Sequence, residues 1–396
     1  MSLNSNIVII GGGTAGITIA ARLLKANKSL KVKIIDPAQR HYYQPLWTLV
    51  GGGLAKFEET DRSMQEVMPA GVEWIQEKVS RIDPEAKAVH TEAGNEISYD
   101  ALVVAPGIRL AFEEVEGLTE ALDNDDRVWT NYSPKYVNKG TKAIQSFKGG
   151  AAFFTFPQSP VKCGGGPQKI MWITEQWLVK NKVRDASNVN FIAPGGAIFG
   201  VPKYRDALQV LVEERNIQTH FGQHVVAVDH ENSEITVENV ETKERTTQKY
   251  DLLHVTPPQR AFNFVKESGI ANDAGFVDVN RETLQHIKYP EIFSAGDASS
   301  LPTAKTGAAV RKQAPILVEN LIAHLKNQSV KPKYDGYTSC PLVVSHNQVI
   351  LAEFGYDGAI LETFPFNQAK PRKTMYFLKR TMLPKIYFSG MLKGRM

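Results

Sequence analysis

The chain has 396 residues, of which 42% are hydrophobic, 22% charged and 9% aromatic, so it can form two or more cored domains and is not extensively disordered. It runs almost at once into an apolar strand, without the pattern of a secretory signal, and no apolar run approaches the ~20 residues that span a bilayer, so we expect neither a signal peptide nor a transmembrane helix. The net charge of +4 conceals a cationic tail, because no acidic residue follows Glu362.

The N-terminal part of the chain predicts a dinucleotide-binding site. A buried strand over residues 6–10 is followed by the turn Gly11-Gly12-Gly13-Thr14-Ala15-Gly16 and a helix through about Lys25. The first glycine of such a turn permits the tight bend, the second lets the backbone approach a pyrophosphate, and the third lets helix and strand pack closely. A second strand over residues 31–35 ends at Asp36, where a carboxylate can bind ribose hydroxyls.

Two later segments favour FAD over NAD as the cofactor. An apolar strand over residues 101–105 leads into Pro106-Gly107, and Glu291-Ile-Phe-Ser-Ala-Gly-Asp297 follows much later. Both resemble motifs of FAD-dependent oxidoreductases of the pyridine nucleotide type, whose last aspartate binds the ribityl or pyrophosphate region. The chain therefore returns to its first domain, and we expect a discontinuous FAD-binding domain over residues 1–115 and 272–330.

Residues 116–271 predict a second Rossmann-like domain with a degenerate NAD site. A strand over residues 188–193 is followed by Pro194-Gly-Gly-Ala-Ile-Phe-Gly200, which places Gly195, Ala197 and Gly200 at the three glycine positions. Alanine at the middle position crowds a pyrophosphate, and no acid for a ribose follows the next strand, near residues 218–221. We therefore expect that electrons do not enter from NADH.

The chain contains only two cysteines, Cys163 and Cys340. Cys163 lies between a predicted strand and a helix, and the three glycines after it leave its sulfur open. Helix N–H groups and the nearby Lys162 and Lys169 should lower its pKa. Cys340 begins an apolar strand in the last region, residues 331–396; alone it is more typical of packing than of chemistry. Because structural disulfides are uncommon without an export signal, we interpret the two thiols as a reactive pair.

The cationic tail predicts contact with a membrane surface. Pro384 divides it into two short amphipathic stretches, and we place Met375, Leu378 and Met382 on one face of the first, with Phe388, Met391 and Leu392 on one face of the second. Aromatic and aliphatic side chains interleaved with lysine and arginine suit a helix in the lipid interface, although a helix packed on the body stays an alternative. The same interleaving argues against nucleic acid as a partner.

Metal binding is not expected. None of the nine histidines shows ligand spacing with a cysteine or an acid, and two cysteines alone cannot form a structural zinc site. We expect His41 to shape the surroundings of the flavin.

Four motifs together resemble the sulfide:quinone oxidoreductase family, most closely the branch that includes the mitochondrial enzyme. They are the two cysteine segments, His41-Tyr-Tyr-Gln-Pro-Leu-Trp-Thr-Leu-Val-Gly-Gly-Gly53 and Leu301-Pro-Thr-Ala-Lys-Thr-Gly-Ala-Ala-Val310. The resemblance covers nearly the whole chain. It implies an α/β fold of two tandem Rossmann-like domains with a C-terminal amphipathic helical region that binds the membrane.

The resemblance also implies roles for individual residues. Cys163 and Cys340 would form a disulfide or sulfur-bridged pair beside the flavin, so their sulfur atoms should lie no more than about 10 Å apart. Lys169 and Lys379 match catalytic-site lysines. The FAD contacts would include Gly107 together with Asp36, Gln44, Val79, Asp297 and Lys305. A third cysteine that attaches FAD covalently in some relatives is missing here, which implies non-covalent FAD.

The implied activity is oxidation of hydrogen sulfide by FAD and the cysteine pair. Electrons would pass to a membrane quinone, ubiquinone or menaquinone, and sulfane sulfur to a small acceptor such as glutathione, sulfite or coenzyme A. Two alternatives are a type II NADH:quinone reductase-like flavoprotein and a non-catalytic redox-sensing flavoprotein. We expect a peripheral protein of a bacterial inner membrane, and the sequence leaves its oligomeric state open, as it does which cysteine keeps the persulfide.

Overall fold

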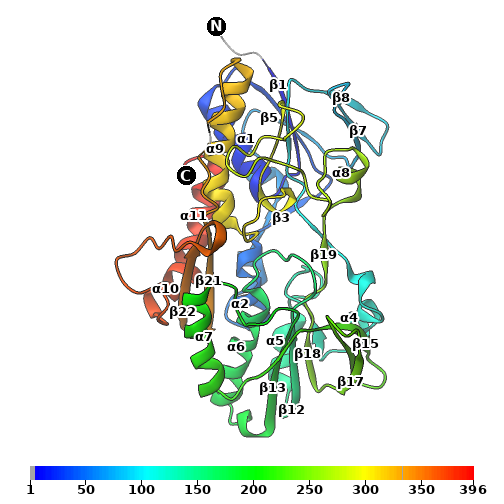
Figure 1. The fold of residues 1–396 in the computed structure, drawn as a ribbon, viewed down its shortest axis with the longest axis vertical. Helices are drawn as coiled ribbons and strands as arrows, with labels where there is room; N and C mark the ends of the chain where they lie inside the picture. Colours follow the sequence, from blue (N-terminus) through cyan, green and yellow to red (C-terminus); the bar gives the residue numbers. More distant parts are fainter. Residues whose placement is uncertain (1–4, 332) are drawn as a thin grey trace.

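The computed structural model describes residues 5–331 and 333–396 and consists of two lobes, one above the other in Figure 1. The first lobe contains a five-stranded parallel sheet in the order β20-β9-β1-β2-β5. Its strands β1, β9 and β20 are almost continuous apolar runs because both faces of a parallel sheet are covered. The strands are β1 (Asn6–Ile10), β2 (Lys31–Ile35), β5 (Val72–Ile75), β9 (Ala101–Val104) and β20 (Ile292–Ser294).

Two helices far apart in the sequence lie side by side in this lobe, α1 (Thr14–Ala26) and α9 (Gly307–Leu325). Strand β20 joins the sheet of β1 and β9, so the chain returns to the first lobe after the second, and apolar residues from Phe262 onward pack against the core of the first lobe. Smaller elements complete the lobe: β3 (Arg40–Tyr42), α2 (Trp47–Gly51), β4 (Asp61–Ser63), α3 (Met64–Val67), β6 (Val79–Asp83), β7 (Ala88–Thr91), β8 (Glu96–Ser98) and α8 (Asn263–Glu267).

The second lobe repeats the plan with a parallel sheet in the order β11-β18-β12-β13-β14 and a separate antiparallel sheet β15-β16-β17. A short antiparallel pair, β10 (Arg109–Leu110) with β19 (Gln259–Arg260), lies where the chain passes between the lobes (Figure 1). The strands are β11 (Val128–Trp129), β12 (Gly150–Thr155), β13 (Ser187–Ala193), β14 (Gln218–Phe221), β15 (Gln223–Asp229), β16 (Glu234–Asn239), β17 (Arg245–Lys249) and β18 (Leu252–His254). The helices are α4 (Leu118–Asn124), α5 (Lys139–Ser146), α6 (Gly166–Lys180) and α7 (Pro202–Glu214).

The C-terminal region begins with a hairpin, β21 (Thr338–Ser345) and β22 (Gln348–Phe354), that belongs to both lobes. Side chains alternate along a strand. Val343 and Leu351 therefore pack into the core of the first lobe, whereas Leu342 and Ala352 pack into the core of the second. The hairpin thus brings its own residues, including Cys340 of β21, to the junction of the lobes.

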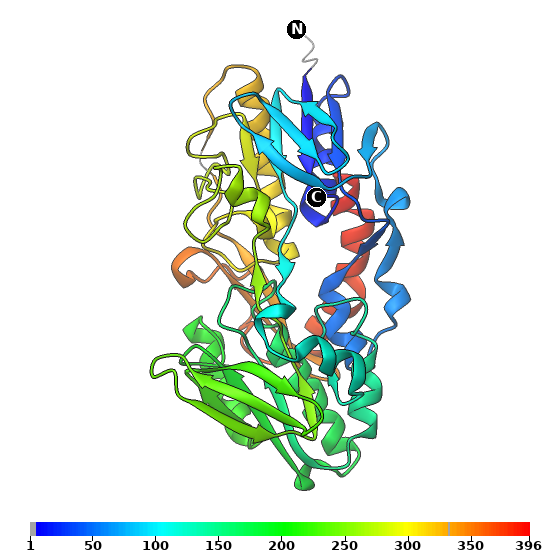
Figure 2. The same cartoon turned by 90° about the vertical axis from the view of Figure 1, so that its right-hand side faces the viewer.

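The tail forms α10 (Lys373–Phe377), a π-helical segment over Leu378–Met382 and α11 (Leu383–Ser389), with Pro384 in the first turn of α11. In Figure 2 this red helical stretch lies alongside the blue part of the first lobe. Among the described residues, no helix combines the length and apolar character required to cross a membrane.

The predicted apolar faces of the tail are wrong in detail. Met375 is buried whereas Met382 is 39% exposed, because the π-helical segment changes the angular spacing of the residues between them. Met391 and Leu392 lie in the core of the first lobe, and Gly394 contacts the backbone of α1 at Ala21. The alternative of a tail packed on the body therefore holds for its last residues.

Candidate active site at the sulfur pair

The two cysteines meet at the junction of the lobes, with their Sγ atoms 3.5 Å apart. Cys163 lies in the loop between β12 and α6, and Cys340 is the third residue of β21. Both are free thiols, and Cys340 is only 2% exposed. The structure thus places the sulfur atoms well within the ~10 Å reach of a sulfur bridge.

The loop that carries Cys163 is held in a strained form by its neighbours. Cys163 has φ of +58°, in the left-handed region that non-glycine residues rarely adopt. Its N–H donates to the Lys305 carbonyl at 2.7 Å, and its carbonyl accepts from the Gly166 N–H at 2.7 Å. A Cβ on Gly165 would lie 2.6 Å from the Cys340 sulfur, so glycine is what lets the loop approach the hairpin.

Lys169, one turn into α6, gives the two thiols different charge states. Its Nζ is buried and donates to the Cys163 sulfur at 3.0 Å. The hydrogen bond with the Cys340 thiol, together with the Lys169 and Lys379 charges, holds the pKa of Cys163 well below its usual range despite burial. The same sulfur–sulfur hydrogen bond and burial raise the pKa of Cys340. The reduced pair is therefore a Cys163 thiolate beside a Cys340 thiol.

Lys379 reaches the same region from the tail. It is 2% exposed, and its Nζ donates to the Pro45 carbonyl at 2.5 Å. Burial and the nearby Lys169 charge lower its pKa to about 7, although the cysteines act in the opposite direction. The structure therefore brings together the four residues expected at the catalytic site, Cys163, Cys340, Lys169 and Lys379.

Lys162 is not among the groups that act on Cys163. Burial lowers its pKa to about 8, and the charge that opposes this shift is that of Asp297. The sequence predicts that Lys162 helps Lys169 to lower the pKa of Cys163. The groups that lower it are instead Cys340, Lys169 and Lys379. The backbone explains the change, because Lys162 pairs with Lys305 and so turns toward the Asp297 segment.

The glycine turn after β1 has the geometry that FAD requires. Gly11 has φ of +100°, and a Cβ there would lie 2.3 Å from the Ala105 carbonyl oxygen; a Cβ on Gly16 would lie 1.8 Å from that of Gly11. Gly13 has no atom within 4 Å of its Cβ position, which leaves its backbone open to a pyrophosphate. Asp36 ends β2 beside this turn and accepts from the Gly12 N–H at 2.6 Å. These residues fit a bound dinucleotide.

The other expected FAD positions lie in three places. Lys305 Nζ donates to the carbonyls of Asp297 and Ser299 at 2.6 and 3.2 Å, so this lysine is tied to the last flavin motif. Gly107, three residues after the end of β9, has φ of +79°, and Gln44 is exposed beside Pro45. Val79 opens β6 in the small antiparallel sheet of the first lobe and is not among the residues gathered around the sulfur pair.

Three buried tyrosines near the site were missed by sequence reasoning. Tyr43 and Tyr132 have pKa values raised by burial and by nearby charges that include the Cys163 thiolate. The Tyr387 hydroxyl lies 2.6 Å from His41 Nε2 and 2.8 Å from Thr14 Oγ1. Tyr43 lies within a recognised motif, but nothing in the local sequence marks Tyr132, and Tyr387 looks like one more aromatic residue of the tail.

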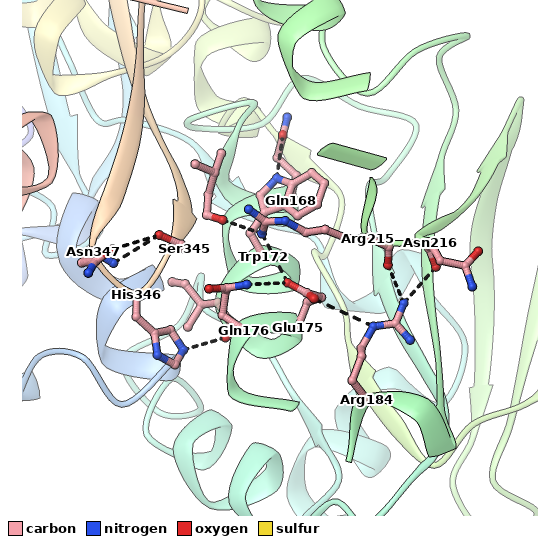
Figure 3. A network of polar contacts seen from close by, with 12 residues as sticks. Gln168, Trp172, Glu175, Gln176, Arg184, Arg215, Asn216, Ser345, His346 and Asn347 are labelled. Carbon is pink, nitrogen blue, oxygen red and sulfur yellow. Dashed lines mark hydrogen bonds and ion pairs between the residues drawn. The ribbon is translucent and has the colours of Figure 1, made fainter. Parts of the chain in front are cut away.

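A buried ion-pair network fixes α6 against the hairpin (Figure 3). Glu175 of α6, 2% exposed, pairs with Arg215 at 3.2 Å and with Arg184 at 3.9 Å. Arg215 also donates to the Val344 carbonyl of β21 at 2.7 Å, and His346 Nε2 lies 3.0 Å from the Ile173 carbonyl of α6. The network therefore sets the distance between the elements that carry Lys169 and Cys340.

The second glycine turn is open at Gly195, Gly196 and Gly200, but its apolar residue Ile198 and the start of the helix after it are held by the protein's own contacts. The Ile198 side chain is 5% exposed, and its carbonyl accepts from the Gln168 amide at 2.9 Å. At the first turn of α7, Lys203 and the Tyr204 hydroxyl both bind the Glu362 carboxylate, at 2.8 and 3.0 Å. A carboxylate at this helix start would repel a pyrophosphate, which a nucleotide site would place there.

A cavity of about 460 Å³ opens beside the cysteine loop. Its lining includes Pro160 of that loop, Lys305, Phe276 and Asn272, with Phe354 and Asp357 from the C-terminal region. Because the Lys305 carbonyl accepts the Cys163 N–H, the cavity wall is in direct contact with the sulfur site.

No group of three or more histidine, cysteine, aspartate or glutamate side chains suited to hold a metal ion occurs among the described residues.

Comparison with known proteins gives consistent matches. A family described as pyridine nucleotide-disulphide oxidoreductase matches residues 5–166. The chain is 45% identical to the mitochondrial sulfide:quinone oxidoreductase of Mus musculus over 98% of this chain and 86% of that protein. It is 42% identical to that of Dictyostelium discoideum, over 99% and 86% of the two chains. The solved sulfide:quinone oxidoreductase of Aquifex aeolicus superposes with a TM-score of 0.83 at 22% identity, covering 98% and 92%, which confirms the α/β fold of two Rossmann-like domains.

Proposed function

The chain belongs to the sulfide:quinone oxidoreductase family, whose members are FAD-dependent enzymes, and we propose that it oxidises sulfide through the pair Cys163 and Cys340. The observation that carries this proposal is the approach of two free thiols to 3.5 Å beside a buried ammonium, in a chain with no other cysteine. Membership in this family argues against the two alternatives, an NADH reductase and a non-catalytic sensor.

We infer the direction of the sulfur chemistry from the different pKa values of the two thiols. In the oxidised pair, hydrosulfide forms a bond to Cys340 while the Cys163–Cys340 bond breaks, and the electron pair leaves with Cys163. A disulfide is opened fastest when the departing thiol has the lower pKa. Lys169 holds the pKa of Cys163 low, so Cys163 leaves as a thiolate and Cys340 keeps the persulfide.

The chain's own residues would hold FAD at the glycine turn, with Asp36 on the ribose and the Asp297–Lys305 segment toward the ribityl end. When bound, FAD supplies the two-electron acceptor that links the sulfur pair to quinone. The direct hydrogen bond from Cys163 to Lys305 supports this arrangement, because it joins the cysteine loop to the FAD segment. Only two cysteines occur, and both lie at the sulfur site, so we propose that FAD is held without a covalent bond.

We propose that the sulfur acceptor approaches from the cavity lined by Pro160 and Lys305. Its volume of about 460 Å³ can admit a small nucleophile such as glutathione or sulfite, or the thiol end of coenzyme A. The acceptor would attack the outer sulfur of the Cys340 persulfide and leave a Cys340 thiolate, and the pair would close again once FAD, when bound, accepts its two electrons.

The quinone would meet the flavin from the side of the tail. Phe377 and Met382 are 57% and 39% exposed on the tail, with the exposed Lys373 and Lys385 nearby in sequence. Apolar side chains flanked by lysines suit attachment in the plane of a lipid interface. Two of the relatives are named as mitochondrial, and nothing supports the expectation of a bacterial inner membrane.

One experiment tests the proposal directly. Anaerobic sulfide should bleach the visible absorbance of the purified flavoprotein, quinone should restore it, and NADH should have no effect. Cys163→Ser and Cys340→Ser should each abolish bleaching by sulfide. Normal bleaching in Cys163→Ser would refute the mechanism, and bleaching by NADH would restore the reductase alternative.

A further inference from the structure

Tyr132 has a buried hydroxyl without a hydrogen-bond partner among the described residues. Its side chain is 7% exposed, and it follows β11 at the junction of the lobes. Buried polar groups in proteins are nearly always satisfied, and each exception costs about 1–3 kcal/mol. The Thr256 hydroxyl, 1% exposed, lies close enough for a weak hydrogen bond that lowers the pKa of Tyr132, but neither oxygen has a partner at full hydrogen-bonding geometry among the described residues. The Tyr132 hydroxyl therefore has a proton available for a group that enters the site.

The Tyr132 hydroxyl lies against Gly166, in the segment that also contacts the Cys340 sulfur. A Cβ on Gly166 would lie 2.4 Å from the Tyr132 oxygen, and a Cβ on the preceding residue, Gly165, would lie 2.6 Å from the Cys340 sulfur. The phenol and the sulfur therefore contact adjacent residues of one chain segment. The charges of Cys163 and Cys340 act on Tyr132 as well, which places all three in one site.

We propose that Tyr132 is a further residue of the sulfur site, whose hydroxyl donates a hydrogen bond to the sulfur atom that hydrosulfide adds to Cys340. The inference rests on the proposed function, because it concerns the persulfide formed there. Tyr132 keeps its proton throughout: the new bond joins the incoming sulfur to Cys340, the old bond to Cys163 breaks, and the hydroxyl stabilises the partial negative charge on the added sulfur.

Chemistry restricts which neighbour can perform this task. The Lys169 ammonium donates a hydrogen bond to the Cys163 sulfur and also acts on Cys340, whereas the Lys379 ammonium donates to the Pro45 carbonyl. Because the pKa of Tyr132 is raised, its phenol stays protonated. It can therefore stabilise a persulfide by donating a hydrogen bond, without reacting with the sulfur.

The test is Tyr132→Phe, with Tyr136→Phe as the matched control. Tyr136 lies four residues further on and donates to Asp123 at 2.9 Å, away from the sulfur pair. Oxidised protein is mixed with one equivalent of sulfide and quenched at short times, and mass spectrometry counts the extra sulfur on the Cys340 peptide. Loss of a hydrogen bond to a charged sulfur should slow sulfur addition about tenfold to a hundredfold in Tyr132→Phe and leave Tyr136→Phe unchanged. An unchanged rate in Tyr132→Phe overturns the proposal.

A second variant keeps the test independent of protein stability. Gly166→Ala should slow sulfur addition in the wild-type background, because its methyl group displaces the hydroxyl. The same substitution should have little further effect when it is added to Tyr132→Phe, which has no hydroxyl to displace. Equal effects in both backgrounds would contradict the placement of the hydroxyl.

Failure of the proposed function gives a different result. In that case wild-type protein itself adds no sulfur to Cys340. The contact of Tyr132 with the site is then tested by the rate of Cys163 alkylation across a pH series, which needs no sulfide. A shifted profile in Tyr132→Phe supports the contact, and an unshifted profile rejects it.

Discussion

Tyr387 donates a hydrogen bond to His41 across 346 positions of sequence, and this bond fastens the tail to the dinucleotide turn. His41 Nδ1 lies 3.2 Å from the Gly12 carbonyl, which can only accept, so Nδ1 carries the proton and Nε2 accepts from Tyr387 at 2.6 Å. Burial lowers the pKa of His41 to about 4, which keeps the ring neutral. The Tyr387 oxygen in turn accepts from the Thr14 hydroxyl at 2.8 Å.

Tyr387→Phe should therefore weaken FAD binding, because His41 Nε2 and the Thr14 hydroxyl lose this partner beside the glycine turn. The loss of about 1–3 kcal/mol should raise the fraction of released FAD roughly tenfold, measured as flavin fluorescence after gel filtration. Tyr376→Phe on the same helical stretch is the control. Equal FAD retention in both variants would show that the tail and the turn are not coupled.

Lys169→Met should raise the pKa of Cys163, because the ammonium that stabilises the thiolate is removed. Alkylation of Cys163 by iodoacetamide near neutral pH should slow about tenfold or more, with the midpoint of the pH profile moved upward. Lys180→Met, at the exposed end of the same helix, should leave the profile in place. A profile that does not move in Lys169→Met would assign the low pKa to another group.

Lys379 should make stability rise with pH. Its pKa is lowered to about 7 when folded and is near 10.5 when unfolded, so the unfolded chain binds the extra proton between these values. The contribution of this residue therefore increases from about pH 7 upward, by at most about 1.4 kcal/mol per pH unit, and is constant below. Urea unfolding between pH 6 and 9 should show a steeper slope in wild type than in Lys379→Met. Lys385→Met should retain the wild-type slope.

Arg215→Met should destabilise the junction between α6 and the hairpin. Glu175 is 2% exposed and would lose its nearer cation, while the Val344 carbonyl would lose its donor. Breaking a buried pair in this way costs roughly 3 kcal/mol, to be measured by denaturant unfolding. The control, Arg205→Met, removes an exposed pair with Asp206 and should cost less than about 1 kcal/mol. A loss in Arg215→Met no greater than that of the control would mean that the network does not hold these elements.

Phe377→Ser combined with Met382→Ser should reduce binding to anionic vesicles without changing the bleaching of the flavin by sulfide. The two side chains are exposed on the tail, and their burial in lipid would contribute about 1.5–3 kcal/mol each. Sedimentation with vesicles measures the effect. Ile287→Ser, which removes a 66% exposed side chain elsewhere, is the control. Full sedimentation of the double variant would contradict attachment through this part of the tail.

The sequence by itself determined those elements that depend only on neighbouring residues, such as short apolar strands and glycine turns. The strands at residues 6–10, 31–35 and 218–221 have the predicted bounds, because strand bounds follow from short apolar runs ended by turn residues. The glycine turn and Asp36 could likewise be predicted, since tight turns and close backbone approach leave few residue choices.

Only the tertiary structure decided which side chains share a site. The 3.5 Å contact of Cys163 with Cys340, the hydrogen bond of Tyr387 with His41 and the placement of the Tyr132 hydroxyl against Gly166 all join segments far apart in the chain. Local patterns could not place them, nor show that a π-helical segment turns Met375 inward and Met382 outward. The physical reason is that the packing of the lobes, hairpin and tail sets the burial and direction of each side chain. Local periodicity shows only which residues share a face of one helix or strand.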